Sequence, residues 1–353
     1  MHAGSRTLAG DDMKRVVMVT GGGGYIGSHC VVRLLEEGCD IVILDDLSTG
    51  SLQTIRTLQG IDSRGRVLDC VQGSVLDEAC LDEAFASHDI DAVMHFAALS
   101  QVGESAVDPG RYYRNNVAGT MCLLDSMRRH GVSDIVLSSS AAVYGNPVYT
   151  PMDEEHPKLP VNPYGRTKLA MERMVEDYSA AYGIRGVSLR YFNAAGADSK
   201  GRIGECHDPE THLIPSILKS SLKGDAKLRI FGTDYDTRDG TCIRDYVHVE
   251  DLAEAHSLAL RYLEDGGATD SLNIGTSEGY TVKEVLAACE SVTGEAIPWE
   301  ASGRRPGDPA ILLADSRKAD RILGWRPRRT LEDSIRTAYE WEKKKLTSSR
   351  CSP

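Results

Sequence analysis

A run of four glycines, Gly21–Gly24, constrains the fold of this chain more than any other feature. It joins an apolar, β-branched segment to a helical one within Val16–His29, VVMVTGGGGYIGSH. Glycine disfavours a helix interior, but it accepts a positive φ and lets a ligand approach the backbone closely. The stretch therefore predicts a strand, a tight turn and a helix start. Gly21, Gly24 and Gly27 form the spacing G-x-x-G-x-x-G, a variant of the glycine turn that places a pyrophosphate at a helix N-terminus.

Apolar segments alternate with helical patterns along the first half of the chain. Strands are expected at RVVMV (15–19), DIVILD (40–45), AVMHFAA (92–98), DIVLSSS (134–140) and GVSLRYFN (186–193). Helices are expected at 25–38, 115–131 and 163–183, and each ends at a glycine. Apolar strands separated by helices indicate a parallel sheet covered on both faces. We therefore expect an α/β fold built on a Rossmann-type, doubly wound parallel sheet.

The second half of the chain reads differently, because loops rich in Gly, Asp and Pro separate its short elements. It predicts a smaller, discontinuous C-terminal lobe at the carboxyl ends of the strands, where long loops are typically functional. The expected units are a disordered leader at 1–13, a dinucleotide-binding domain at 14–196, a substrate lobe mainly at 197–342 and a tail at 343–353, with segments around 241–276 returning to the first domain. Within the lobe, TVKE at 281–284 predicts a capping box that opens a helix.

Composition and charge exclude several classes of protein. The formal net charge of −12 disfavours a nucleic-acid partner, because an acidic chain repels phosphate backbones. Nine cysteines are spread singly, without a C-x-x-C pair, which argues against a disulfide framework and favours a reducing, cytoplasmic compartment. No apolar run approaches the roughly 20 residues of a membrane span, so no membrane partner is expected. No H-E-x-x-H spacing or clustered ligand set appears, so no metal site is expected, and His95 and His248 are interpreted as structural.

The second predicted strand, VILDD, ends in an acidic residue that indicates the type of nucleotide. An acid at the end of the strand that follows a dinucleotide turn binds the ribose hydroxyls of NAD. The carboxylate of Asp45 in this position repels the 2′-phosphate of NADP. The expected cofactor is therefore NAD.

A Y-x-x-x-K pair, Tyr164 and Lys168, opens the predicted helix that Asn162 and Pro163 begin. Residues four apart share one face of a helix. A free tyrosine titrates at about pH 10, but a nearby ammonium and the positive nicotinamide ring favour its phenolate. Tyr164 is thus a candidate general base. Ser140 ends a predicted parallel strand, where its hydroxyl can hold a substrate oxygen.

With these residues in place, the chain resembles the extended short-chain dehydrogenase/reductase family, and within it the UDP-glucose 4-epimerases. The resemblance runs from about Lys14 to Trp341. The motifs that carry it are VTGGGGYIGSH, HFAAL, VGES, NNVAGT, SSSAAVYG, NPYGRTK, LRYFNAAGA, FGTDYDTRDGTCIRDYVHVEDLA and RRPGDPA.

The resemblance implies two sets of binding residues. Those implied for NAD are Gly21, Gly24, Tyr25, Ile26, Gly27, Asp45, Asp46, Leu47, Ser48, Thr49, Gly50, Ser74, Val75, Phe96, Ala97, Ala98, Leu99, Ser100, Asn115, Ser140, Tyr164, Lys168 and Phe192. Those implied for the UDP-sugar are Asn193, His212, Leu213, Arg229, Ile230, Phe231, Arg244, Arg305, Pro306, Gly307, Asp308 and Leu312. Arg244 and Arg305 are the natural partners of the diphosphate, because a guanidinium binds phosphate oxygens bidentately.

The resemblance also implies the reaction, an NAD-dependent interconversion of UDP-glucose and UDP-galactose through a transient 4-keto sugar. Tyr164 is then the base and acid, Lys168 lowers its pKa and contacts the nicotinamide ribose, and Ser140 holds the sugar oxygen. A homodimer is implied through Tyr112–Arg129 and Tyr164–Tyr182.

Four positions depart from the family pattern or bear on specificity. Ser74 stands where the enterobacterial members have aspartate, Ser100 where lysine is common and His212 where asparagine is common. Each alters a predicted contact without touching the Tyr/Lys pair. Leu312 aligns with the position where a large aromatic side chain excludes N-acetyl groups, so activity on UDP-N-acetylhexosamines is expected.

Three other functions remain to be weighed at this point. A 4,6-dehydratase would need an Asp-Glu pair after the strand-end hydroxyl, and this chain has Ala141 and Ala142 there. Epimerisation of UDP-glucuronate or a UDP-pentose shares the Tyr/Lys chemistry and stays open. A non-catalytic NAD-binding interaction protein on the same fold is a further alternative, against which the complete Ser140, Tyr164 and Lys168 set argues.

Overall fold

The computed structural model describes residues 15–207, 209–223, 227–305 and 308–350, with side chains up to residue 347. Seven strands, all paired in parallel, form its main sheet in the order β11-β6-β5-β4-β1-β2-β3. They are β1 (Val16–Thr20), β2 (Asp40–Asp45), β3 (Val67–Gln72), β4 (Ala92–His95), β5 (Asp134–Ser140), β6 (Arg185–Tyr191) and β11 (Asp270–Ile274). The strand order reverses between β1 and β4, which opens a crevice at the carboxyl ends of the strands. The doubly wound α/β fold expected from the sequence is confirmed.

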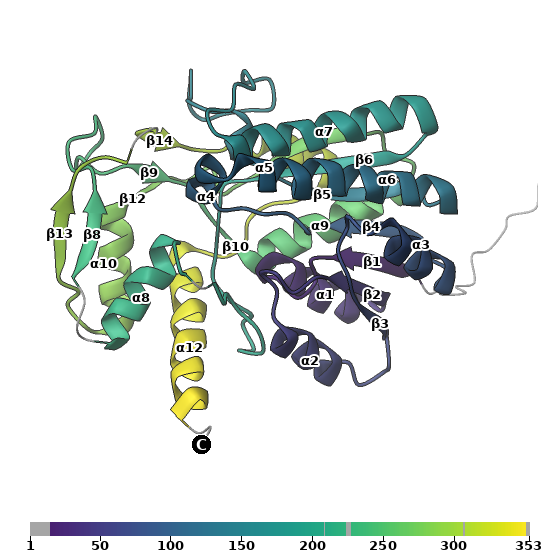
Figure 1. Ribbon diagram of the computed structural model, residues 1–353. Helices are drawn as coiled ribbons and strands as arrows, with labels where there is room; N and C mark the ends of the chain where they lie inside the picture. The colour runs from purple at the N-terminus through teal and green to yellow at the C-terminus, as the bar shows by residue number, and fades with distance from the viewer. Residues whose placement is uncertain (1–14, 208, 224–226, 306–307, 351–353) are drawn as a thin grey trace, which may run out of the picture.

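Helices cover both faces of this sheet (Figure 1). One face packs against α1 (Tyr25–Glu37) and α9 (Val249–Glu264), and the other against α3 (Glu78–Ser87), α6 (Gly119–His130) and α7 (Pro163–Tyr182). The remaining helices here are α2 (Leu52–Ile61), α4 (Val102–Val107), α5 (Pro109–Tyr112), the π-helix η1 (Tyr113–Ala118) and the 3₁₀ turn η2 (Ala141–Val143). Strand side chains alternate between two cores, as the two-residue period of a strand requires. This is why the buried strands read as unbroken apolar runs.

Several boundaries differ from those expected. The strand expected at 92–98 stops at His95, and the one expected at 186–193 ends at Tyr191, before a separate strand, β7 (Asn193–Ala195). The chain leaves the sheet at both points to form loops at its carboxyl edge. The helix expected at 115–131 begins instead as the π-helix η1. Strand β3 escaped prediction because it lies at the sheet edge, where most of its side chains are partly exposed.

Within the described residues, the second half of the chain forms three small sheets beside the main one, two of them on the left of Figure 1 and the third nearer its centre. Its elements are α8 (Leu213–Lys223), β8 (Leu228–Phe231), β9 (Ile243–Arg244), β10 (Tyr246–His248), β12 (Tyr280–Thr281), α10 (Val282–Thr293), β13 (Trp299–Ser302), β14 (Ile311–Leu312), α11 (Arg317–Leu323) and α12 (Leu331–Arg350). Between β10 and β12 the chain passes through α9 and β11, which belong to the main sheet and its cover. Thr281 and Glu284 form the predicted capping box at the start of α10.

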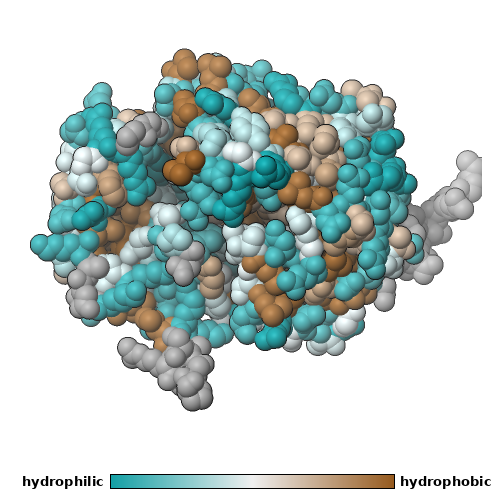
Figure 2. Space-filling model, in the orientation of Figure 1, coloured by the Kyte–Doolittle hydropathy of each residue, from teal (hydrophilic) through white to brown (hydrophobic). Residues whose placement is uncertain are grey.

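The surface seen in Figure 2 is mostly polar, with apolar side chains gathered in separate patches. Among the described residues, no helix combines the length and apolar character of a membrane span. The leader at 1–13 and the end of the tail lie outside the described residues.

Candidate functional site

The glycine turn after β1 can be built only from glycine at two of its positions. Gly21 has a φ of 73°, and a Cβ there would lie 2.7 Å from the backbone nitrogen of Ala97. A Cβ on Gly27 would collide with the carbonyl oxygen of Gly21. The turn is therefore pressed against the loop that follows β4, and helix α1 starts directly behind it.

The start of α1 fits a bound pyrophosphate. Gly24 is its N-cap, and no side chain of the described residues caps the helix. A Cβ on Gly24 would meet only the Gly21 carbonyl oxygen, at 3.2 Å, so the space around this position is otherwise open. The first N–H groups of α1, at Tyr25 and Ile26, thus have the free hydrogen-bonding capacity and positive dipole end that attract an anion.

Asp45, at the end of β2, is a buried acid that also braces the turn. Its carboxylate accepts hydrogen bonds of 2.8 Å from the backbone N–H groups of Gly23 and Leu47. The backbone of Gly50 packs closely against this carboxylate, since a Cβ at Gly50 would lie 2.6 Å from one of its oxygens. Burial raises the pKa of Asp45 above its ordinary value, against the lowering effect of these two hydrogen bonds. The remaining lone pairs of the carboxylate are suited to ribose hydroxyls.

The other predicted cofactor residues follow the strands at the same edge of the sheet. Asp46–Gly50 follow β2, Ser74 and Val75 follow β3, Phe96–Ser100 follow β4, and Phe192 follows β6. The side chain of Val75 is buried in the core beside Gly119, so only its backbone can serve a ligand.

Asn116, which the sequence interpretation missed, organises the loop after β4. Its side-chain amide accepts a hydrogen bond from Leu99 N–H (2.8 Å) and donates to the Leu99 carbonyl (3.0 Å) and the Thr167 hydroxyl (3.0 Å). Asn116 is fully buried, whereas its neighbour Asn115, the predicted cofactor residue, is half-buried and donates to it. Both lie in η1, where the wider turn of a π-helix commonly marks a functional site.

The three predicted catalytic residues meet where β5 and α7 face each other. Asn162 caps α7 by accepting a hydrogen bond from Gly165 N–H (2.8 Å). Tyr164 is 9% exposed, and the Ser140 hydroxyl at the end of β5 acts to lower the pKa of its phenol. Lys168, one turn further along α7, donates a 2.7 Å hydrogen bond to the carbonyl oxygen of Ser138. Its Nζ lies 6.0 Å from the centre of the Tyr164 ring.

Burial is the largest influence on the pKa of both members of this pair, and the expected lowering of the Tyr164 pKa by Lys168 stays a prediction. Burial raises the pKa of the Tyr164 phenol, and the Ser140 hydrogen bond only partly opposes this effect. Burial also lowers the pKa of Lys168 to about 7, although the charge of Glu172 favours the ammonium. Neither group faces water, so desolvation outweighs their attraction in the protein alone. A phenolate at Tyr164 therefore requires further positive charge beside it.

A buried ion pair supports α7 one turn beyond Lys168. The Arg190 guanidinium binds both carboxylate oxygens of Glu172, at 2.9 and 2.7 Å, and Ser139 donates a hydrogen bond to the same carboxylate. Arg190 also donates to the hydroxyl of Tyr144 (3.0 Å). Tyr164, Lys168 and Glu172 follow each other at four-residue steps, so one face of α7 carries all three. Apart from that spacing, no sequence pattern predicts the Arg190–Glu172 ion pair.

Part of the predicted UDP-sugar set converges beside these residues. Arg244, on β9, forms an ion pair with Asp308 and pairs in register with Leu312 on β14. Leu312 packs in one apolar cluster with Phe192, a predicted cofactor residue. Asn193 donates to the backbone carbonyl of Asp245, next to Arg244 (2.8 Å).

Other members of that set lie elsewhere or point away. The guanidinium of Arg305 lies 4.2 Å from the centre of the Phe231 ring. Arg229 has a 68% exposed side chain that pairs with Glu300, and the Ile230 side chain is buried in the lobe core. His212 contacts Glu205 instead of Arg244 or Asp308. Leu213 begins α8, and Pro306 and Gly307 lie outside the described residues.

The loop between β7 and α8 brings together a set of side chains that the sequence did not predict to cluster. Donor atoms of Glu205, His207, Glu210 and His212 all lie within 4.8 Å of one another. Their spacing, E-x-H-x-x-E-x-H, matched none of the metal motifs considered, so the expectation of no clustered ligand set is wrong at this loop. His95 and His248 are buried and hydrogen-bonded to threonine hydroxyls, as expected of structural histidines.

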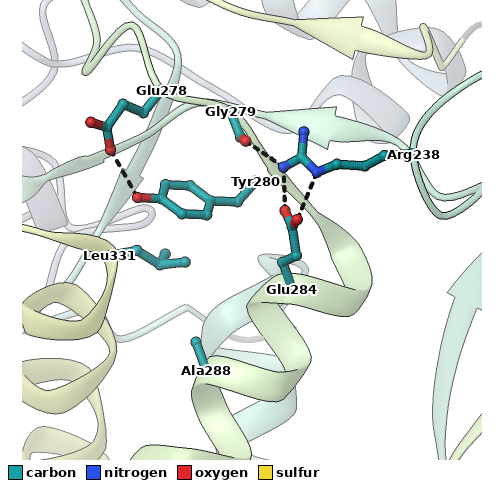
Figure 3. A pocket seen from close by; sticks show the side chains of 7 residues that line it. All are labelled: Arg238, Glu278, Gly279, Tyr280, Glu284, Ala288 and Leu331. Atoms are coloured by element: carbon teal, nitrogen blue, oxygen red, sulfur yellow. Dashed lines mark hydrogen bonds and ion pairs between the residues drawn. The ribbon is translucent and has the colours of Figure 1, made fainter.

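A surface pocket of 480 Å³ on the second lobe is separate from these residues (Figure 3). Its only cation, Arg238, is held by Glu284 and by the carbonyl of Gly279 (2.7 Å). The hydroxyl of Tyr280 donates to Glu278 (2.9 Å). Among the described lining residues, the cation is thus already paired with a carboxylate, so the pocket offers an anionic ligand no unpaired cation.

Comparison with known proteins agrees with the resemblance drawn from the motifs. Residues 17–275 match the model of the NAD dependent epimerase/dehydratase family. The UDP-glucose 4-epimerase of Halalkalibacterium halodurans is 49% identical over 328 residues, which cover 93% of this chain and 95% of that protein.

Two solved structures are also similar over nearly the whole chain. UDP-glucose 4-epimerase from Brucella ovis in complex with NAD has a TM-score of 0.87 and 45% identity, covering 92% of this chain and 97% of that one. The enzyme from Stenotrophomonas maltophila with bound NAD and formylated UDP-arabinopyranose has a TM-score of 0.91 and 39% identity, covering 96% and 100%. The chain belongs to the NAD-dependent epimerase/dehydratase family, and it is a homologue of the UDP-glucose 4-epimerases within it.

Proposed function

We propose that this protein interconverts UDP-glucose and UDP-galactose by inverting C4 of the hexose, with NAD as a retained cofactor. The observation that carries the proposal is the meeting of Ser140, Tyr164 and Lys168 at the carboxyl edge of the sheet, beside a glycine turn with an uncapped helix start. The similarity to UDP-glucose 4-epimerases over 93% of the chain supports it and favours it over a non-catalytic protein.

The residues divide the chemistry between them. Tyr164 takes the proton of the 4-hydroxyl and returns it after the sugar has turned over. Ser140, at the end of β5, holds the sugar oxygen through its hydroxyl. When bound, NAD supplies a hydride acceptor and donor at C4 and a positive ring near the phenol. Burial raises the pKa of Tyr164, and a positive charge beside the phenol would act in the opposite direction.

The second lobe holds the nucleotide part of the substrate. We assign the diphosphate to Arg244 and Arg305, whose present partners are the carboxylate of Asp308 and the ring of Phe231. Phosphate oxygens can replace these partners, since a guanidinium binds phosphate bidentately. This scheme grips the UDP and leaves the hexose loosely held, as inversion of C4 requires.

We further propose that UDP-N-acetylhexosamines are substrates as well. Leu312 and Phe192 pack against the same apolar cluster, and leucine is smaller than an aromatic side chain in that position. The similarity to UDP-glucose 4-epimerases over 93% of the chain favours UDP-glucose and UDP-galactose over a UDP-pentose or UDP-glucuronate as substrates.

We also propose that the chain divides into an NAD-binding domain at 14–196 and a lobe at 197–342. We further propose a homodimer, a cytoplasmic location and a place in galactose metabolism. The dimer is supported by exposed apolar side chains on α4 to α7, including Val107, Met121 and Tyr182. The location is supported by cysteines that are all free among the described residues.

The proposal is tested by replacing Tyr164→Phe, with Tyr149→Phe as the matched control. Tyr149 is exposed, lies in the loop between η2 and α7, and donates a hydrogen bond to Asp153 (2.7 Å). Loss of UDP-galactose turnover in Tyr164→Phe, with NAD content and turnover of Tyr149→Phe unchanged, supports the scheme. Equal turnover by the two variants contradicts it.

A further inference from the structure

The loop between β7 and α8 contains a built cluster of metal-type ligands that the proposed reaction does not use. Glu205 and Glu210 contribute carboxylates, and His207 and His212 contribute imidazoles. Both imidazoles direct Nδ1 at the same oxygen of Glu205, His207 at 2.8 Å and His212 in closer contact. Nδ1 of His212 also lies 3.9 Å from an oxygen of Glu210. The segment 205–212 therefore brings four donor atoms to within 4.8 Å of one another.

The donor chemistry indicates which ions suit this cluster. Two imidazole nitrogens and two carboxylate oxygens are ligands of Zn²⁺, which binds them at about 2.0–2.2 Å in a tetrahedral arrangement. The largest separation among the four donor atoms is 4.8 Å, so shifts of about 1 Å suffice to reach tetrahedral spacing. Ca²⁺ and Mg²⁺ prefer all-oxygen sites, so the imidazoles select for a transition metal.

The surroundings of the cluster hold its ligands in place. Lys219 binds one oxygen of Glu210 at 3.0 Å and leaves the other directed toward His212. The backbone carbonyl of Glu205 accepts a hydrogen bond from the indole of Trp341 on α12 (3.0 Å). Gly204, just before it, packs against the same indole, since a Cβ there would lie 2.6 Å away. Outer contacts of this kind orient metal ligands.

Burial adds an electrostatic reason for a cation. The side chains of Glu205 and Glu210 are only 5% and 8% exposed. A buried carboxylate is costly unless it is paired or coordinates a metal, and here Lys219 pairs with only one oxygen of Glu210 while both imidazoles face one oxygen of Glu205. A divalent ion among the four donor atoms neutralises both carboxylates at once.

We propose that Glu205, His207, Glu210 and His212 bind one divalent transition-metal ion of the Zn²⁺ type. The ion fastens the loop to α8 at Leu213, directly after its last ligand, and to Tyr25 of the glycine turn, whose ring packs edge-on against His207. We assign the ion a structural role, and the proposal rests on the four ligands and not on the proposed function. It also makes His212 a metal ligand instead of the substrate contact that the sequence resemblance implied.

The test measures metal in the full-length protein after exhaustive dialysis against a chelator and reloading with zinc chloride. We expect one zinc per chain by mass spectrometry and a raised Tm on reloading, since an ion that binds only the folded state stabilises it. His207→Ala and Glu210→Gln should each weaken zinc binding on the order of a hundredfold. His207 lies partly at the surface, so its variant should fold, which a circular dichroism spectrum checks.

Cysteine is the main competing ligand, and the same loop supplies the control. Cys206→Ser, between two proposed ligands, should keep full zinc binding. Cobalt substitution should yield the absorption of a site with nitrogen and oxygen ligands. A thiolate-to-cobalt charge-transfer band, loss of binding in Cys206→Ser, or unchanged binding in both His207→Ala and Glu210→Gln would overturn the proposal, as would no zinc uptake by the wild-type chain.

Discussion

Lys168 donates its 2.7 Å hydrogen bond to the backbone carbonyl of Ser138, and this bond ties the helix of the candidate base to the strand of the candidate hydroxyl. The ammonium is thereby held beneath the Tyr164 ring while it stays out of direct contact with the phenol oxygen. Its effect on Tyr164 is one of position and field, and burial sets the protonation of both groups.

The buried lysine should leave a signature in the pH dependence of stability. Burial lowers the pKa of Lys168 from 10.5 to about 7, so between these values the unfolded chain binds one proton more than the folded chain. Stability then rises with pH in this window, by at most about 1.4 kcal/mol per pH unit. Urea unfolding of the wild type and Lys168→Met, at matched NAD content, should show the difference growing in favour of the wild type above about pH 7. Parallel pH profiles would mean that Lys168 is not desolvated in this way.

Gly21 should tolerate alanine far less well than Gly131. Both have positive φ, 73° and 76°, but a Cβ at Gly21 meets the backbone of Ala97, while one at Gly131 meets nothing within 4 Å. We expect Gly131→Ala to lower the free energy of unfolding by about 1 kcal/mol, the cost of the left-handed backbone alone. Gly21→Ala should lower it by a further 1–3 kcal/mol or so, as in an overpacked core, and weaken NAD binding. Chemical denaturation compares the two, and equal losses would contradict the close approach.

Asn116 and Asn115 should separate stability from cofactor binding. Asn116→Ala removes three buried hydrogen bonds, two of them to the backbone of Leu99, and should cost about 2–4 kcal/mol of unfolding free energy. Asn115→Ala removes one half-buried bond and should cost about 1 kcal/mol at most while raising the Kd for NAD. Denaturation and nucleotide titration of both variants check this. A larger stability loss in Asn115→Ala would reverse the assignment.

Substrate breadth should depend on Leu312. Leu312→Tyr enlarges this side chain and reduces the space beside the apolar cluster against which Leu312 and Phe192 pack. We expect kcat/KM for UDP-N-acetylglucosamine to fall on the order of tenfold or more relative to UDP-glucose, because a site discriminates through the contacts it offers. Leu159→Tyr, at an exposed position, is the control and should leave the ratio unchanged. A wild-type protein that turns over only UDP-glucose and UDP-galactose would refute the expected breadth.

Much of the fold follows from local patterns. The core strands β1, β2 and β5 are predictable from the sequence because they are buried on both faces and form apolar runs. Helix α7 is predictable because Asn162 and Pro163 begin it and Gly183 ends it. The edge strand β3 lacked that signal, since a strand covered on one side only has no unbroken apolar run.

Other features depend on contacts between distant segments. Nothing in the letters NNVAGT predicts that η1 widens so that Asn116 reaches Leu99 and Thr167. The protonation of Lys168 and Tyr164 follows from burial, which only the packed structure reveals. The ligand cluster around Glu205 likewise arises from how an irregular loop folds against α12.

The central claim is tested most directly by mixing the purified protein with UDP-galactose, adding no NAD, and following the sugar by proton NMR. We expect UDP-glucose to form at equilibrium with UDP-galactose, because in the proposed epimerisation the cofactor stays bound and the net redox change is zero. No conversion, even after NAD is supplied, would contradict the assignment and favour a uronate, pentose or non-catalytic function.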